Sequence, residues 1–124
     1  MQTISSVSVK YHNIKDQTKN GYLKEARMSE LIKEDQWVYV VMHGPEGNEQ
    51  ILGQQDEEAN VSFIPVFLKK EEALMNLNLL AREKGHKYEV QAILYEDLIA
   101  RTAEQGFMIF VLNESGEIVE KISP

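Results

Sequence analysis

The 124-residue sequence contains no cysteine, which excludes disulfide bonds, thiolate catalysis and metal sites built on cysteine. It also lacks any run of about 18 apolar residues, the length needed to cross a bilayer. The first ten residues do not have the positively charged start and continuous apolar block of a signal peptide. From these absences we expect no membrane association and a cytoplasmic location.

Motifs for nucleotide binding and catalysis are missing as well. The sequence has no GxxxxGK[ST] or GxGxxG loop, no Gly-x-Ser-x-Gly elbow and no HExxH pair. Its three histidines, His12, His43 and His86, are far apart in loop-like settings, and the acidic run 56–58 lacks the alternating ligands of a calcium loop. The sequence therefore predicts no metal, no cofactor and no catalytic residue, and it favours a protein that is not an enzyme.

Charge is plentiful but unevenly distributed. The net charge is −7, yet residues 1–27 carry five basic and two acidic side chains, which leaves −10 on the rest of the chain. An acidic body repels phosphate backbones, so we expect no nucleic-acid binding. The basic leader is predicted either to be solvated or docked on the protein's own acidic face, or to dock on an acidic partner.

The pattern that is present belongs to a single α+β domain over residues 22–124, preceded by a leader over 1–21 that is predicted to be either an edge strand or a mobile terminus. Helices are predicted over 22–34, 71–84 and 96–104. Strands are predicted over 36–42, 51–52, 61–67, 88–94, 107–112 and 117–122.

Between these elements, two shorter features have predictions of their own. Residues 54–60 are polar and acidic and are predicted to form a surface loop, and Pro65 places its strand at an edge or at a bulge.

The order strand, helix, strand, helix, strand over 61–112 predicts a βαβαβ core with three parallel strands and right-handed crossovers. Hairpins on either side add antiparallel strands. We therefore expect an α+β fold with a mixed sheet of five to six strands and with the helices mainly on one face.

Part of the chain resembles the SseB N-terminal domain family. The resemblance covers residues 61–116 and rests on four segments, Phe63–Phe67, Lys69–Ala73, Tyr95–Leu98 and Gly106–Asn113. Glu114 stands where the family usually has proline. Similar small bacterial domains of unknown function share the same order of elements. The resemblance implies an α+β fold in a bacterial accessory protein, without an established reaction.

If a small ligand is bound, the position with a physical argument is the crevice outside the carboxyl ends of the parallel strands. That edge is predicted to hold Phe67, Lys69, Tyr95 and Asn113. His43 joins this set because it closes a predicted central strand and precedes a glycine-containing loop.

Three functions are consistent with these features. The first is a non-enzymatic interaction or regulatory module that binds a protein partner or itself as a homodimer. The second is a small-ligand-binding protein or minor enzyme that uses the carboxyl edge of the sheet, with His43 or Tyr95 as the proton-transfer group. The third is an acidic immunity or anti-restriction type of protein that blocks a basic partner by charge complementarity.

Overall fold

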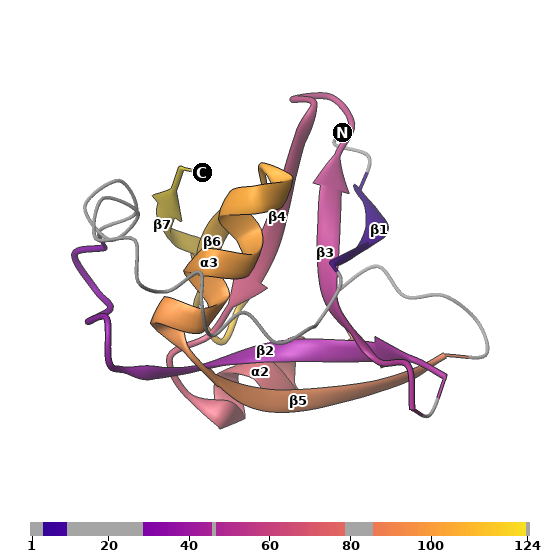
Figure 1. Cartoon of the computed structure of the whole chain (residues 1–124), viewed down its shortest axis with the longest axis horizontal. Helices are drawn as coiled ribbons and strands as arrows, with labels where there is room; N and C mark the ends of the chain where they lie inside the picture. The colour runs from indigo at the N-terminus through magenta and orange to yellow at the C-terminus, as the bar shows by residue number, and fades with distance from the viewer. Residues whose placement is uncertain (1–3, 10–28, 46, 79–85, 124) are drawn as a thin grey trace.

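The computed structural model describes residues 4–9, 29–45, 47–78 and 86–123 (Figure 1). Its strands are β1 (Ile4–Val9), β2 (Trp37–Gly44), β3 (Gln50–Asp56), β4 (Val61–Val66), β5 (Lys87–Leu94), β6 (Met108–Leu112) and β7 (Ile118–Ile122). Two helices are described, α2 (Lys70–Asn76) and α3 (Tyr95–Gln105). The α+β class, the mixed sheet and the predicted order of elements over 61–112 are confirmed.

Six strands follow the order β5-β2-β3-β4-β6-β7, and β1 pairs with β3 off this path. Ile51 of β3 pairs with Met42 of β2 and with Val9 of β1. Farther along β3, residues 54–56 pair both with β4 and with β1. Because a strand has two edges, β1 takes one edge of β3, and β2 and β4 share the other at its opposite ends.

This shared edge bends the sheet. In Figure 1, β2 and β5 run across the view, whereas β3 and β4 stand nearly upright. The buried Gly53 lies between the part of β3 that pairs with β2 and the part that pairs with β4. A glycine inside a strand commonly marks such a bend, because it brings no side chain into a crowded turn of the backbone.

The prediction of three parallel strands is wrong, since the one parallel pair among the described strands is β4 with β6. β5 runs antiparallel to β2 at the far end of the strand order. The chain leaves β4 through α2, crosses to that far edge, and returns through α3 to lie beside β4. Strand order depends on long-range pairing, which the local pattern over 61–112 does not contain.

The helices pack against opposite faces of the sheet, not mainly against one face as the sequence suggested. Val38 and Val40 of β2 belong to a core cluster with Leu98 and Ile99 of α3. Tyr39, which points the other way, packs against a second cluster that contains Ala73 of α2. Both faces of β2 are therefore covered, which explains why its sequence is apolar at nearly every position.

Pro65 is accommodated where β4 has one paired neighbour. The pairing of β3 with β4 covers β4 only as far as Phe63, while the pairing of β4 with β6 continues through Pro65 to Val66. The missing N–H of proline is tolerated at an edge of this kind. The prediction of an edge position is therefore correct locally, although β4 as a whole lies inside the sheet.

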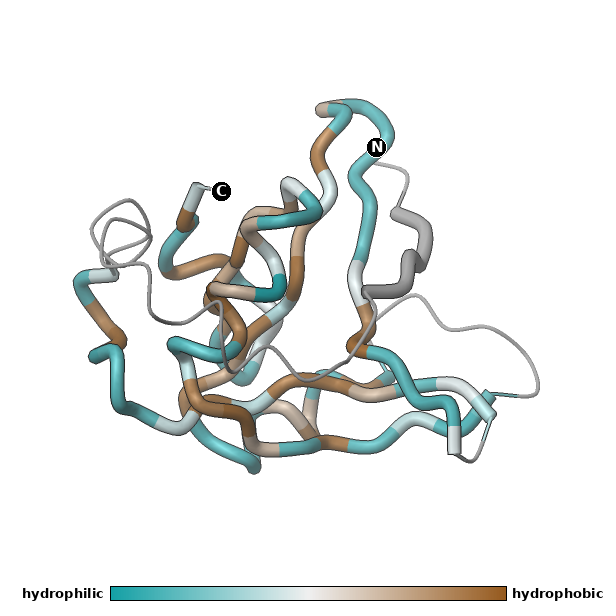
Figure 2. The backbone as a smooth tube through the Cα atoms, viewed as in Figure 1, coloured by the Kyte–Doolittle hydropathy of each residue, from teal (hydrophilic) through white to brown (hydrophobic). Residues whose placement is uncertain are grey.

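Two predicted boundaries need correction. Residues 54–56, predicted to begin a surface loop, continue β3, and Gln54 and Asp56 are buried there. Figure 2 shows β3 changing from hydrophobic to hydrophilic along its length, which is why the polar half was not recognised as strand. Within the predicted helix 22–34, residues 29–34 are not helical, and 22–28 lie outside the described residues.

Other elements lie close to their predicted positions. α3 extends one residue beyond each predicted end and is followed by Gly106, whose φ of 74° is the left-handed conformation common after a helix. α2 is shorter than predicted within the described residues, because it ends at Asn76, and residues 79–85 lie outside them. β1 lies within the predicted leader, of which 1–3 and 10–21 are outside the described part. No described helix has the length and apolarity to cross a membrane.

Candidate functional site

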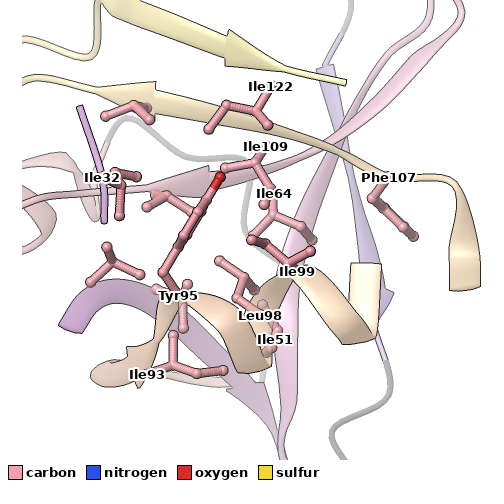
Figure 3. Packing of buried hydrophobic residues seen from close by; sticks show 14 of the residues in the cluster. Ile32, Ile51, Ile64, Ile93, Tyr95, Leu98, Ile99, Phe107, Ile109 and Ile122 are labelled. Atoms are coloured by element: carbon pink, nitrogen blue, oxygen red, sulfur yellow. The ribbon is translucent and has the colours of Figure 1, made fainter. Parts of the chain in front are cut away.

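Two of the residues predicted for a ligand edge are core residues. Phe67 is fully buried and belongs to the cluster beneath α2. Tyr95 is 1% exposed, and its backbone N–H donates to the carbonyl of Gln36 at 2.9 Å. In Figure 3 its ring reaches from the start of α3 across the other cluster toward Ile109. Packing of the two core clusters accounts for both aromatic rings.

Lys69 and Asn113 lie on the surface near α2. Lys69 is exposed and precedes the helix. Asn113 organises the turn between β6 and β7, since its Oδ1 accepts the backbone N–H groups of Ser115 and Glu117 at 2.9 and 3.0 Å. This is the way asparagine commonly shapes a turn.

Asn76 links α2 to that same turn. Its side-chain amide donates to the backbone carbonyls of Asn113 and Glu114 at 2.9 and 3.2 Å, and to Glu72 within the helix at 2.8 Å. The Asn76 side chain is buried, and its Oδ1 has no hydrogen-bond partner. The structure thus brings Phe67, Lys69 and Asn113 around α2, whereas Tyr95 packs on the opposite face.

His43, the fifth predicted residue, lies at the other end of β2 in an aromatic cluster. It is 3% exposed, and its ring stacks on that of Tyr88 with centroids 5.7 Å apart and planes inclined by 17°. His86 completes the group, with its ring centroid 5.5 Å from that of His43 and 6.5 Å from that of Tyr88. The Nδ1 atoms of the two histidines are 3.4 Å apart. We call these three residues the histidine cluster.

Strand register builds this cluster. His43 is paired directly opposite Tyr88 in the antiparallel β2–β5 ladder, and opposite residues share a face of the sheet. His86 immediately precedes β5 and is two positions from Tyr88, so the alternation of a strand brings it to the same face. His86 and Tyr88 are half-buried, which leaves the cluster accessible from one side.

An open pocket of about 210 Å³ lies at the same end of these strands. It is lined by Met42, Gly44, Glu49, Lys87 and Glu89. Met42 and Glu89 are paired one position along from His43 and Tyr88, so the pocket opens on the opposite face from the histidine cluster. Its charged side chains are two carboxylates and one ammonium group.

Exposed apolar side chains form the other notable surface. They are Leu31, Trp37, Leu74, Met75, Ile118 and Val119, each at least 45% exposed. Trp37 is two positions from Tyr39 on β2 and therefore shares the face that α2 covers. Ile118 is paired with Leu112 of the cluster beneath α2. We call Trp37, Leu74, Met75 and Ile118 the α2 patch.

No family model, curated protein or solved structure matches this chain. The resemblance of residues 61–116 to the SseB N-terminal domain family stays a prediction. Function must accordingly be inferred from the described residues themselves.

The sequence did not identify the histidine cluster. Along the chain His43 and His86 are far apart in loop-like settings, and Tyr88 is simply the first residue of the predicted strand 88–94. The one available signal was the alternation that places His86 and Tyr88 on the same face of β5. Their meeting with His43 depends on the pairing of β2 with β5, which joins segments distant in sequence.

Proposed function

We propose that this protein is a non-enzymatic interaction module that binds a protein partner, or a second copy of itself, through the α2 patch. The observation that carries the proposal is that two large apolar residues of the patch are exposed to solvent, Trp37 at 56% and Met75 at 63%. Large exposed apolar side chains gathered on one face commonly mark interaction surfaces. Tryptophan is also enriched among residues that dominate binding energy.

The residues beneath the α2 patch are well packed and ordered. Phe67 and Ala73 beneath α2 are fully buried, and Asn76 joins the helix to the β6–β7 turn just before Ile118. Docking on an ordered surface of this kind costs little conformational entropy, which favours binding. A bacterial, cytoplasmic accessory role is part of this proposal, in line with the predicted family resemblance.

Affinity capture with matched variants tests the proposal. The tagged protein is used to capture partners from its native host at low and high salt, beside Trp37→Ser, Met75→Ser and the control Glu58→Ser in the exposed β3–β4 loop. We expect a stoichiometric partner that both patch variants lose and the control retains. Sedimentation of the purified chain, with the same variants, tests whether the partner is a second copy.

The salt dependence of partner binding distinguishes this proposal from binding through the acidic part of the chain. Contact through apolar side chains persists at high salt, whereas attraction between charged surfaces is screened within about 10 Å at 0.1 M salt. A partner that is released by salt but bound equally by the patch variants would instead favour the acidic-blocker function. A monomeric chain that captures no partner would contradict the proposal.

The alternative function is a small-ligand-binding protein or minor enzyme. The histidine cluster favours it, because two imidazoles and a phenol are groups able to exchange protons with a ligand. A thermal-shift screen of metabolites with wild type, Tyr88→Phe and Asn113→Ala tests this alternative and locates the site. Stabilisation lost in Tyr88→Phe places the ligand at the cluster, and stabilisation lost in Asn113→Ala places it at the predicted carboxyl edge.

A further inference from the structure

β5 is an edge strand with a regular backbone. Among the described strands it pairs with β2 alone, at one end of the strand order, and Figure 1 shows it as the outermost strand beside β2. Its eight residues pair with β2 without a register shift, and they include no proline. A long, regular edge strand is a ready template for pairing with another chain.

The hydrogen bonds of β2 identify which residues of β5 direct their backbone groups outward. The backbone N–H of Tyr95 donates to the carbonyl of Gln36 at 2.9 Å, in the same register as the β2–β5 ladder. Hydrogen-bonded pairs alternate along an antiparallel ladder, so the backbone of Gln91 bonds to β2. Val90 and Ala92 are the alternate residues, and their N–H and C=O groups are therefore directed away from β2.

The bonds of Tyr39 agree with this alternation. Tyr39 is paired opposite Ala92, yet its backbone N–H and carbonyl bond to Phe67 at the other edge of β2. The facing backbone groups of Ala92 therefore point to the outer side of β5. Ala92 is exposed and Val90 is half-buried, so a strand approaching this edge can reach both residues.

The outward groups of Val90 and Ala92 match those of a second copy of β5. When two such strands run antiparallel about a two-fold axis at Gln91, Val90 of each copy lies opposite Ala92 of the other, and these pairs exchange hydrogen bonds. We propose that the protein forms a homodimer in which the β5 strands of two copies pair antiparallel about Gln91, joining the two sheets into one.

The side chains of β5 fit this register. Val90 packs against the cluster beneath α2, and its small neighbour Ala92 leaves room beside it on the same face. On the other face the uncharged Gln91 lies opposite itself, and Glu89 lies opposite Ile93. A two-fold axis at Glu89 would instead set two carboxylates opposite each other, which is destabilising. The β5 pairing does not use the α2 patch, so it stands apart from the function proposed above.

Amide hydrogen exchange tests the interface at the residues that form it. In a monomer the N–H groups of Val90 and Ala92 face outward and exchange rapidly, whereas that of Gln91 bonds to β2 and is protected. We expect protection of Val90 and Ala92 to rise with protein concentration as the dimer forms, with Gln91 protected throughout. Rapid exchange at Val90 and Ala92, under conditions where sedimentation shows a dimer, would overturn the proposal.

Variants of β5 test the register by sedimentation. Ala92→Pro removes an N–H that faces away from β2, a position where proline is tolerated, and should raise the dimer dissociation constant at least about five-fold through the lost hydrogen bonds. Gln91→Lys and Gln91→Glu should each self-associate about two- to five-fold more weakly, because like charges lie opposite each other. An equimolar mixture of these two variants should regain the wild-type affinity. Glu58→Gln changes the net charge as Gln91→Lys does, but in the β3–β4 loop, and should dimerise like wild type.

Trp37→Ser separates this interface from the α2 patch. We expect it to dimerise like wild type, and circular dichroism checks that it and Ala92→Pro are folded. Dimerisation that is lost in Trp37→Ser but kept in Ala92→Pro would assign self-association to the α2 patch and contradict the β5 pairing. A wild-type chain that stays monomeric at millimolar concentration would contradict it as well, without bearing on capture of a different protein by the α2 patch.

Discussion

Tyr39 and Phe67 exchange two backbone hydrogen bonds, of 2.9 and 3.0 Å, that join β2 directly to the residue after β4. Both strands already pair with the same edge of β3, one at each end. The bridge therefore closes a ring of three strand segments around the bend at Gly53. The Phe67 side chain fills the space beneath α2 at this closure.

Replacement of Phe67 by alanine should lower the free energy of unfolding by about 3–5 kcal/mol, because the ring is fully buried and leaves a cavity. Lys69→Ala, two residues away but exposed, should change stability by no more than about 0.5 kcal/mol. Urea unfolding measures both. Equal effects of the two substitutions would show that Phe67 is not the core residue described.

Asn76 provides a prediction about polar burial. Asn76→Ala removes the donor to the Asn113 and Glu114 carbonyls and should cost about 1–3 kcal/mol. Asn76→Asp keeps the size but replaces the amide with a buried carboxylate oxygen that faces those carbonyls, so it should cost more at neutral pH. Asn48→Ala, at an exposed position, is the control in thermal unfolding.

Two glycines with positive φ should differ in their tolerance of alanine. At Gly106, with φ of 74°, a Cβ would meet no atom within 4 Å, so the cost is the left-handed conformation alone, about 1–2 kcal/mol. At Gly44, with φ of 121°, the Cβ would lie 3.0 Å from the backbone oxygen of Asn48. Gly44→Ala should therefore destabilise the protein more than Gly106→Ala, as thermal denaturation can establish.

Ser29 and Glu120 should be energetically coupled. The Ser29 hydroxyl donates to the Glu120 carboxylate, which also accepts the backbone N–H of Glu30 at 2.9 Å, so this segment is tied to β7. A double-mutant cycle with Ser29→Ala and Glu120→Ala should give a coupling of about 0.5–1 kcal/mol, modest because both residues are only half-buried. Additive effects would mean that the contact contributes nothing measurable.

Local pattern was sufficient for elements whose own residues decide their structure. The alternation of Tyr88, Val90 and Ala92 predicted β5, and the glycine at 106 predicted the end of α3. The local pattern was not sufficient for residues 54–56. These residues are polar, and they are buried because strands pair with them on both edges. A polar strand of that kind has the local composition of a loop.

The site was harder to predict than the elements, because register decides it. Phe67 and Tyr95 follow strands in sequence, but the faces to which they point depend on which helix covers each face. His43 meets Tyr88 only through the β2–β5 pairing, and no local pattern reports a pairing between segments so distant in sequence.

The route of the chain from β4 out to β5 and back to β6 also affects how the protein folds. β5 and α3 lie in the sequence between β4 and β6, which become parallel neighbours in the sheet. β6 therefore cannot pair with β4 through a short hairpin. Forming such a contact closes a long loop, and the chain loses conformational entropy before the contact stabilises it. Folding is therefore slower than for a helical domain of equal size. The chain cannot be divided between β4 and β6 into two parts that each keep all their strand pairings. The described strands should therefore unfold together as one cooperative unit.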